Sequence, residues 1–183
     1  VLPGEHGLDE RPDRTAADLA RAVDVERPER AGRKPELVVV GMGHVLAGPE
    51  DFTGRLAYYV DLVRLRTPLR YSNAAAASSF IDAHGASSFL LWAGFQEFRG
   101  AVNAACDGGM SAFDLYHRAG MVLDEAVNAV PAPGAAQPGE LSPFDFPAQV
   151  VMDTGRAASL GYRFDHIDEW LDDTIRQHDL AFV

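Results

Sequence analysis

The chemistry-bearing part of the chain begins at a glycine-rich segment, Gly-Met-Gly-His at positions 41–44, directly after a short apolar run. A dinucleotide-binding fingerprint needs Gly-x-Gly-x-x-Gly where a strand passes into a helix, because backbone N–H groups at the helix N-terminus hold the pyrophosphate. Leu46 stands at the third glycine position, and Gly48-Pro49 interrupts any helix that begins there. The segment therefore does not predict a dinucleotide site by itself.

Histidine is the next residue type with chemical potential. None of the six histidines stands at metal-ligand spacing from a cysteine or a carboxylate, so we predict no metal site. His44 lies inside the glycine-rich segment, where ligand-binding residues of α/β folds gather, and its ring can donate or accept a hydrogen bond near neutral pH. His44 either belongs to a site or ties down its loop. His84, just after the apolar segment 78–83, is a second candidate.

Arginines supply the positive charge, since Lys34 is the single lysine. The one basic concentration is Arg55, Arg64, Arg66 and Arg70. A solvated helix face explains three of them, and the remaining one is a candidate for binding an anionic substrate group.

Two predicted strands end near these candidates, one at position 41 and one at position 83. Because ligands of open α/β sheets bind beyond the carboxyl ends of strands, we predict a substrate-binding site there. Its members would be His44, Arg70, Phe80 and His84, with Phe80 as an apolar wall.

Several other functions lack support in the sequence. No Gly-x-Ser-x-Gly elbow is present to anchor a hydrolase triad, and the acidic pairs in 165–173 are typical of a solvated helix face. The net charge of −11 argues against a nucleic-acid partner. No apolar run is long enough for a membrane span and no secretory signal opens the chain, so we expect no membrane partner. One cysteine, Cys106, fits a reducing, cytoplasmic compartment.

The elements that must position these residues alternate between strands and helices, which predicts the α/β class. Residues 36–41 form the clearest strand, and its continuous apolarity is typical of a strand covered on both faces. Further predicted strands are 78–83 and 101–105. Predicted helices span 52–65, 86–98, 111–129 and 166–178, and a short helix capped by Asp153 closes at Leu160-Gly161. The proline-rich segment 130–147 is the main predicted loop.

Two parts are predicted along the chain. Residues 1–35 form an N-terminal arm and linker, with a possible helix at 15–25. Residues 36–183 form a substrate-binding-type α/β domain.

The order of motifs after residue 36 resembles the C-terminal, substrate-binding half of the extended short-chain dehydrogenases/reductases, the NAD-dependent epimerase/dehydratase family. That family has an Arg-Pro-Gly-Asn-Val-Tyr-Gly-Pro-Gly loop, and residues 40–51 resemble it, with His44 where asparagine is usual. Three further segments resemble family motifs in the same order: Phe80-Ile81-Asp82, Gly100-Ala-Val-Asn103 and Asp153-Thr-Gly-Arg-Ala-Ala-Ser-Leu-Gly161.

The resemblance implies a partial α/β fold with few strands and several covering helices. It also implies that the loop borders both ligands, with Met42 and Gly43 toward the cofactor and His44 toward the substrate. The chain departs from the family pattern in two ways, and these limit what the resemblance implies about the cofactor. The family's Tyr-x-x-x-Lys pair has no match, and only 35 residues precede the region where a complete Rossmann half should stand. We therefore expect NAD or NADP only if a Rossmann half is supplied elsewhere, and no cofactor for this chain alone.

Three hypotheses for function remain open. In the first, the chain is the substrate-binding half or subunit of an NAD(P)-dependent oxidoreductase-like enzyme acting on a small molecule. In the second, it is a truncated non-redox relative that binds a ligand or a partner. In the third, it is a cofactor-independent cyclase or dehydratase. Because a half-fold exposes apolar surface, we expect a homo-oligomer or a Rossmann-bearing partner chain.

Overall fold

The computed structural model describes residues 38–132 and 142–181. The chain divides into two units, residues 1–35 and residues 36–183, and everything below concerns the second unit. The sequence predicts an arm before residue 36 and a substrate-binding-type domain after it, and this assignment stays a prediction. The expected helix at 15–25 lies outside the described residues.

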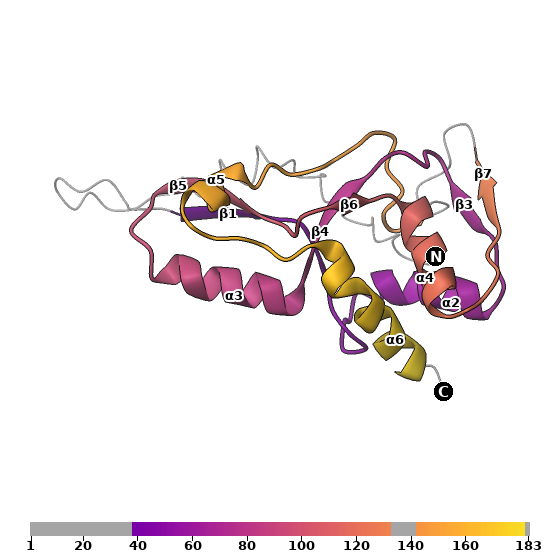
Figure 1. Ribbon diagram of the computed structural model, residues 1–183. Coiled ribbons are helices and arrows are strands. Elements are labelled where there is room, and N and C mark those ends of the chain that lie inside the picture. Colours follow the sequence, from indigo (N-terminus) through magenta and orange to yellow (C-terminus); the bar gives the residue numbers. More distant parts are fainter. Residues whose placement is uncertain (1–37, 133–141, 182–183) are drawn as a thin grey trace, which may run out of the picture. The chain divides into compact units, whose positions relative to one another are not determined.

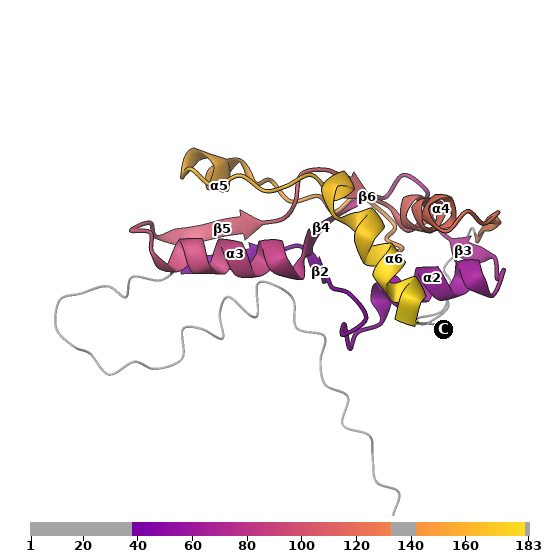
Figure 2. The same ribbon diagram turned by 60° about the horizontal axis from the view of Figure 1, so that its bottom comes forward.

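A parallel strand pair and one helix form the first part of the α/β unit. Strand β1 (Val38–Met42) pairs with β5 (Gly100–Ala104), and Val40 lies opposite Val102. Helix α3 (Ala83–Gly94) runs along this pair in both views (Figures 1 and 2). Phe89 of α3 is fully buried and packs with Val102 and the inward side chains of β1. The predicted strands and the predicted helix are confirmed here.

Strand β1 is less covered than its composition predicts. Val38, Val40 and Met42 point toward α3 and are half-buried, whereas Val39 on the opposite face is 48% exposed. The prediction of a strand covered on both faces is therefore wrong for the described residues. Continuous apolarity specified a strand, but α3 covers one of its two faces.

Short strands make up the rest of the sheet structure. Strand β2 (His44–Leu46) pairs in parallel with β4 (Ser78–Asp82), and β6 (Gly109–Met110) pairs antiparallel with β4. A separate parallel pair joins β3 (Leu69–Tyr71) to β7 (Ala129–Pro131). The sequence predicted β4 and missed the four shorter strands.

Three helices pack around the main core: α2 (Arg55–Arg64), α4 (Ala112–Val122) and α6 (Leu171–Ala181). The apolar stripe of α2 has four members, and all of them are buried. A capping box begins α4, because the Ser111 hydroxyl and the Asp114 carboxylate each accept a hydrogen bond from the other residue's backbone N–H. The stripe residues are Leu56, Tyr59, Val60 and Val63.

Helix boundaries differ from prediction at several places. Helix α3 spans Ala83–Gly94 where the sequence predicts 86–98, because Asp82 caps its N-terminus and the helix ends before Phe95. Helix α4 ends at Val122 rather than at 129, because the chain reverses at Asp124, which has a positive φ of 54°. Val127 then packs back against Gly120. The predicted helix 166–178 is a 3-10 turn, η1 (Ile167–Glu169), followed by α6, with Trp170 between them.

The short helix α5 (Gly155–Ser159) ends as the sequence predicts, but its N-cap is Thr154 rather than the predicted Asp153. The Asp153 carboxylate accepts a hydrogen bond from the Gly155 N–H at 2.8 Å. Leu160 caps the other end, and Gly161 follows with a φ of 97°, a left-handed conformation that glycine adopts without strain. In the described part of the chain, no helix is both long enough and apolar enough to cross a membrane.

Candidate functional site

Strand β4 divides the predicted site residues between two faces. Successive side chains of a strand point to opposite sides, and here Phe80 belongs to the main core while Ile81 belongs to the core under α3. His44 lies opposite Phe80 in the β2–β4 register, with ring centroids 5.6 Å apart. The structure therefore brings His44 and Phe80 together on one face.

His44 is half-buried in an aromatic cluster. Its ring centroid lies 5.1 Å from that of Phe144 and 5.6 Å from that of Phe146, with which it stacks. Burial, and secondarily the charge of Arg55, lowers the pKa of His44 below its ordinary value. Among the described residues, no side-chain hydrogen bond holds the imidazole, which does not support the interpretation that His44 ties down its loop. A neutral ring with both nitrogens available can donate to or accept from a ligand.

Arg55 completes this cluster and was not singled out by the sequence. Its Nε donates to Thr53 Oγ1 at 3.2 Å, and its guanidinium carbon lies 5.3 Å from the centroid of Phe144. In the two ranges that the structure describes, no carboxylate forms an ion pair with Arg55. Arg64 and Arg66, by contrast, pair with Asp179 and Glu125.

Two of the rings around His44, those of Phe144 and Phe146, come from a segment that the sequence predicts to be loop. Tyr59 on α2 fixes that segment, because its hydroxyl lies 3.1 Å from Ser142 Oγ and accepts from the Phe144 N–H at 3.3 Å. Asp145 accepts two further hydrogen bonds from Ser72. These contacts hold Phe144 and the neighbouring Phe146 against His44, across about a hundred residues of sequence.

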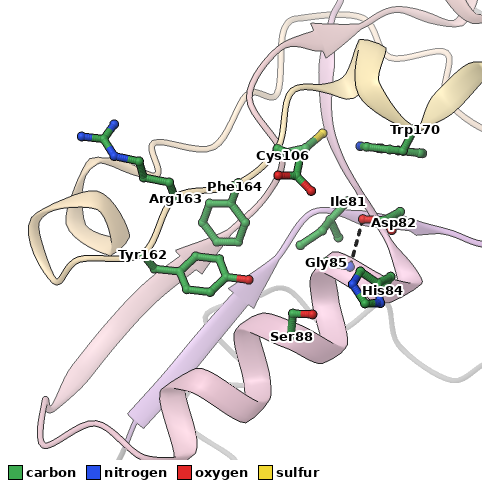
Figure 3. Close-up of a pocket in the computed structure, with 11 residues that line it drawn as sticks. Ile81, Asp82, His84, Gly85, Ser88, Cys106, Tyr162, Arg163, Phe164 and Trp170 are labelled. Carbon is green, nitrogen blue, oxygen red and sulfur yellow. Dashed lines mark hydrogen bonds between the residues drawn. The ribbon is translucent and has the colours of Figure 1, made fainter.

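Arg70 and His84 lie apart from the His44 cluster. Arg70 is exposed on β3, opposite Val130 of β7, in a different sheet from β2 and β4. His84 is exposed in the first turn of α3 and lines a separate cavity on the Ile81 side of β4 (Figure 3). Their place in the substrate site stays a prediction.

Met42 and Gly43, the predicted cofactor contacts, do not form a phosphate cradle in the described structure. The Gly43 N–H donates to Ala104 O at 2.9 Å, and a Cβ at Gly43 would lie 3.0 Å from Ser79 O. Glycine is therefore required here by the chain's own backbone, and β2 follows instead of a helix N-terminus. Met42 packs with the core under α3. These residues do not fit a dinucleotide pyrophosphate, and we derive no chemistry through one.

The described residues contain no candidate metal site. No group of three or more histidine, cysteine, aspartate or glutamate side chains in that part of the chain could hold a metal ion.

Comparison with known proteins places the fold. No family model and no curated protein matches the sequence. Among solved structures, the chain is similar to UDP-glucose 4-epimerase of Thermus thermophilus in complex with NAD, with a TM-score of 0.61 at 16% identity, over 79% of this chain and 47% of that chain. It is also similar to UDP-glucose 4-epimerase of Thermotoga maritima with UDP-glucose, with a TM-score of 0.63 at 13% identity, over 80% and 47%.

A third similar structure is dTDP-glucose 4,6-dehydratase of Bacillus anthracis in complex with NAD, with a TM-score of 0.60 at 8% identity, over 78% of this chain and 44% of that chain. The chain thus spans about half the length of the solved structures that it matches. At these identities the likeness establishes the fold, a mixed α/β arrangement with few strands and several helices that corresponds to part of an epimerase-like chain.

Proposed function

We propose that this chain is the substrate-binding half of an NAD(P)-dependent enzyme of the epimerase, dehydratase or reductase type, acting on a small molecule. The nucleotide-binding half would be supplied by another chain or another stretch of sequence. The observation that carries this proposal is the fold match, which takes in 79% of this chain but 47% of the matched epimerase. The motif order from residue 40 to residue 161 supports the assignment to the substrate-binding half.

The open side of β1 supports the need for a second half. In the described ranges β1 pairs with β5 alone, so its other edge carries unpaired backbone groups. Val39 is exposed on the face of β1 away from α3, and Leu91 and Phe95 of the α3 region are 66% and 81% exposed. Exposed strand edges and apolar patches are typical of surfaces that another structure covers. A parallel strand added beside β1 would extend the sheet.

The His44 cluster supports binding of an anionic small molecule. Arg55 offers a guanidinium without a carboxylate partner in the described part, and arginine binds phosphate or carboxylate with two parallel hydrogen bonds. His44 adds a neutral donor or acceptor, and Phe80, Phe144 and Phe146 surround it with apolar surface. Of the matched proteins, one is in complex with UDP-glucose, another with UDP-glucuronic acid and a third with UDP-N-acetylmuramic acid. Nucleotide-linked sugars are therefore the first probes.

The described residues would bind and orient the substrate. NAD(P), held by the other half, would supply the hydride acceptor and donor. The part of this chain that the structure describes contributes Arg55 for charge, His44 for a hydrogen bond and the phenylalanine rings for exclusion of water. We assign none of these residues to a hydride-transfer step.

Calorimetric titration of the full chain with UDP-glucose, UDP-glucuronic acid and UDP-N-acetylmuramic acid tests the site. We expect one of them to bind, and Arg55→Ala to weaken that binding about tenfold or more, because a charge-assisted hydrogen bond is lost. The sequence favours Arg70 as the anion-binding arginine, whereas the structure favours Arg55. Arg70→Ala, measured beside Arg55→Ala, shows which of the two contributes to binding.

Arg176→Ala is the matched control, because Arg176 is exposed on α6 and pairs with Asp173. Equal binding by the wild-type chain, Arg55→Ala and His44→Ala would contradict this placement of the site. If only Arg70→Ala weakened binding, the binding site would have to be assigned to β3 instead.

A further inference from the structure

The cavity on the other face of β4 has the features of a second ligand site. It has a volume of about 180 Å³ and lies between the start of α3 and residues 162–165, with Trp170 at one side (Figure 3). A cavity of roughly 150 Å³ is large enough to hold one benzene molecule. The cavity therefore suits a ligand of only a few non-hydrogen atoms. Ile81 faces it, whereas Phe80 faces His44, so the two sites are separated by β4.

We propose that this cavity binds a small organic ammonium ion. The proposal does not depend on the function of the His44 cluster.

Charge on the cavity wall favours a cation. Asp82 and Asp165 both line the cavity, and neither forms an ion pair with a basic side chain in the described part of the chain. After burial, these two carboxylates are the causes that raise the pKa of Tyr162, so both act on the same wall. The guanidinium of Arg163 points away from the other lining side chains (Figure 3). The inward-facing charge is therefore negative.

The helix N-terminus beside the cavity does not reverse this preference. An uncapped N-terminus attracts anions through its free N–H groups. Here Asp82 is the N-cap of α3, and its Oδ1 accepts from the Gly85 N–H at 3.0 Å. The chain's own carboxylate thus occupies the position that a bound anion would take.

Aromatic side chains complete a wall suited to a cation. The rings of Tyr162 and Phe164 lie 4.8 Å apart, edge to face, and both pack against Phe89 of the buried core. They are therefore held in place before any ligand arrives. An ammonium ion is attracted to the faces of aromatic rings, most strongly where water is excluded.

Trp170 lines the cavity from the side opposite Tyr162 and therefore reports on its occupancy. Its indole Nε1 is buried and closed off from solvent, so it places no requirement on the ligand. The ammonium group of the ligand would lie between Asp82 and Asp165.

Three small probes of similar size and different charge test the proposal on the full chain: ethanolamine, ethylene glycol and glycolate. Nuclear magnetic resonance would follow the Trp170 indole N–H signal, distinguished from that of Trp92 by the Trp170→Phe variant. We expect a saturable shift with ethanolamine, and dissociation constants at least tenfold weaker for ethylene glycol and for glycolate.

Asp165→Asn should weaken ethanolamine binding by about fivefold, the upper range for a partly exposed ion pair. Asp124→Asn is the matched control and should change nothing, since Asp124 is exposed on the turn after α4 and asparagine tolerates its positive φ. Asp82 is avoided because it caps α3. Equal or stronger binding of glycolate, unchanged binding in Asp165→Asn, or no saturable shift with ethanolamine up to about 100 mM, well above millimolar affinity, would each overturn the proposal.

Discussion

The helical region around α2, α4 and α6 differs from the strand-helix unit β1-α3-β5 in how completely it buries its own apolar surface. In the described part, the main core of the helical region contains sixteen buried residues, and the core under α3 contains six. Ion pairs also close the helical region, because Arg118 on α4 contacts both Asp168 and Asp172 near the start of α6. The strand-helix unit instead leaves Leu91 and Phe95 exposed.

This difference suggests that the helical region stabilises the chain itself, whereas the strand-helix unit offers a surface for association with another structure. The helical region has the larger buried core, although Met121 and Leu180 on its outer surface are exposed. It holds the His44 cluster in place through Tyr59 and Phe144. The strand-helix unit has one covered face and one open edge. We therefore expect substitutions to change folding in the first region and association in the second.

The largest effect is expected in the helical region. Phe144→Ala should lower the free energy of unfolding by about 3–5 kcal/mol, because a fully buried ring that packs against Tyr59, Phe80 and His44 is removed and leaves a cavity. Leu91→Ala on the exposed face of α3 should change it by less than about 0.5 kcal/mol. Urea denaturation of the full chain measures both. If the two variants lost similar amounts of unfolding free energy, the distinction between the two regions would be contradicted.

Association is expected to depend on the open unit. We expect the chain to form an oligomer or a complex, and the double variant Leu91→Lys/Phe95→Lys to weaken that association at least tenfold, since charge replaces apolar contact surface. Met121→Lys is the control, because Met121 is equally exposed but lies on α4. Analytical ultracentrifugation supplies the measurement. A wild-type chain that sediments as a 19.8 kDa monomer at every concentration would count against an interface.

A smaller effect on the free energy of unfolding is expected when the ion pair between α2 and α6 is removed. Arg64 lowers the pKa of Asp179 below its ordinary value, mainly through their hydrogen bond. A depressed carboxylate pKa stabilises the fold above the unfolded-state value of about 3.9, and this contribution is lost as the pH falls through the folded-state pKa. Asp179→Asn should therefore cost at most about 1 kcal/mol at pH 7. Denaturation curves of the variant and the wild type should converge at low pH, and a difference that persists there would refute the linkage.

The smallest effect concerns His44 itself. Burial and Arg55 both lower its pKa. Arg55→Gln removes the charge and leaves the burial, so the pKa of His44 should rise toward its ordinary value without reaching it. A titration followed by histidine ring resonances measures this. No change in the variant would mean that Arg55 does not face His44 in solution.

The sequence predicts the long elements because each carries its own signal. The apolar run of β1 and the four-residue stripe of α2 are local patterns. Strands β3 and β7 lack such a pattern, because each has three residues and forms by pairing with a partner about sixty residues away. The end of α4 was missed for a related reason. Asp124, not glycine, takes the left-handed turn, and Val127 packing on Gly120 stabilises it.

The candidate site was predictable in part. His44 and Phe80 follow from strand ends, and the β2–β4 register places them together. Arg55 was indistinguishable in sequence from Arg64, since both lie on α2, and what separates them is that Asp179 pairs with Arg64. Phe144 lies in a proline-rich segment without periodicity. Its contact with His44 depends on the hydrogen bond to Tyr59, which no local pattern encodes.

Amide hydrogen exchange tests the central claim most directly. The chain expressed alone would be compared with the chain isolated from its natural source in its native assembly, peptide by peptide. The account predicts that β1 and α3 become strongly protected in the assembly, while α2, α4 and α6 exchange equally slowly in both samples. Equal exchange of β1 and α3 in the two samples would contradict the claim that this chain is a half-structure completed by another.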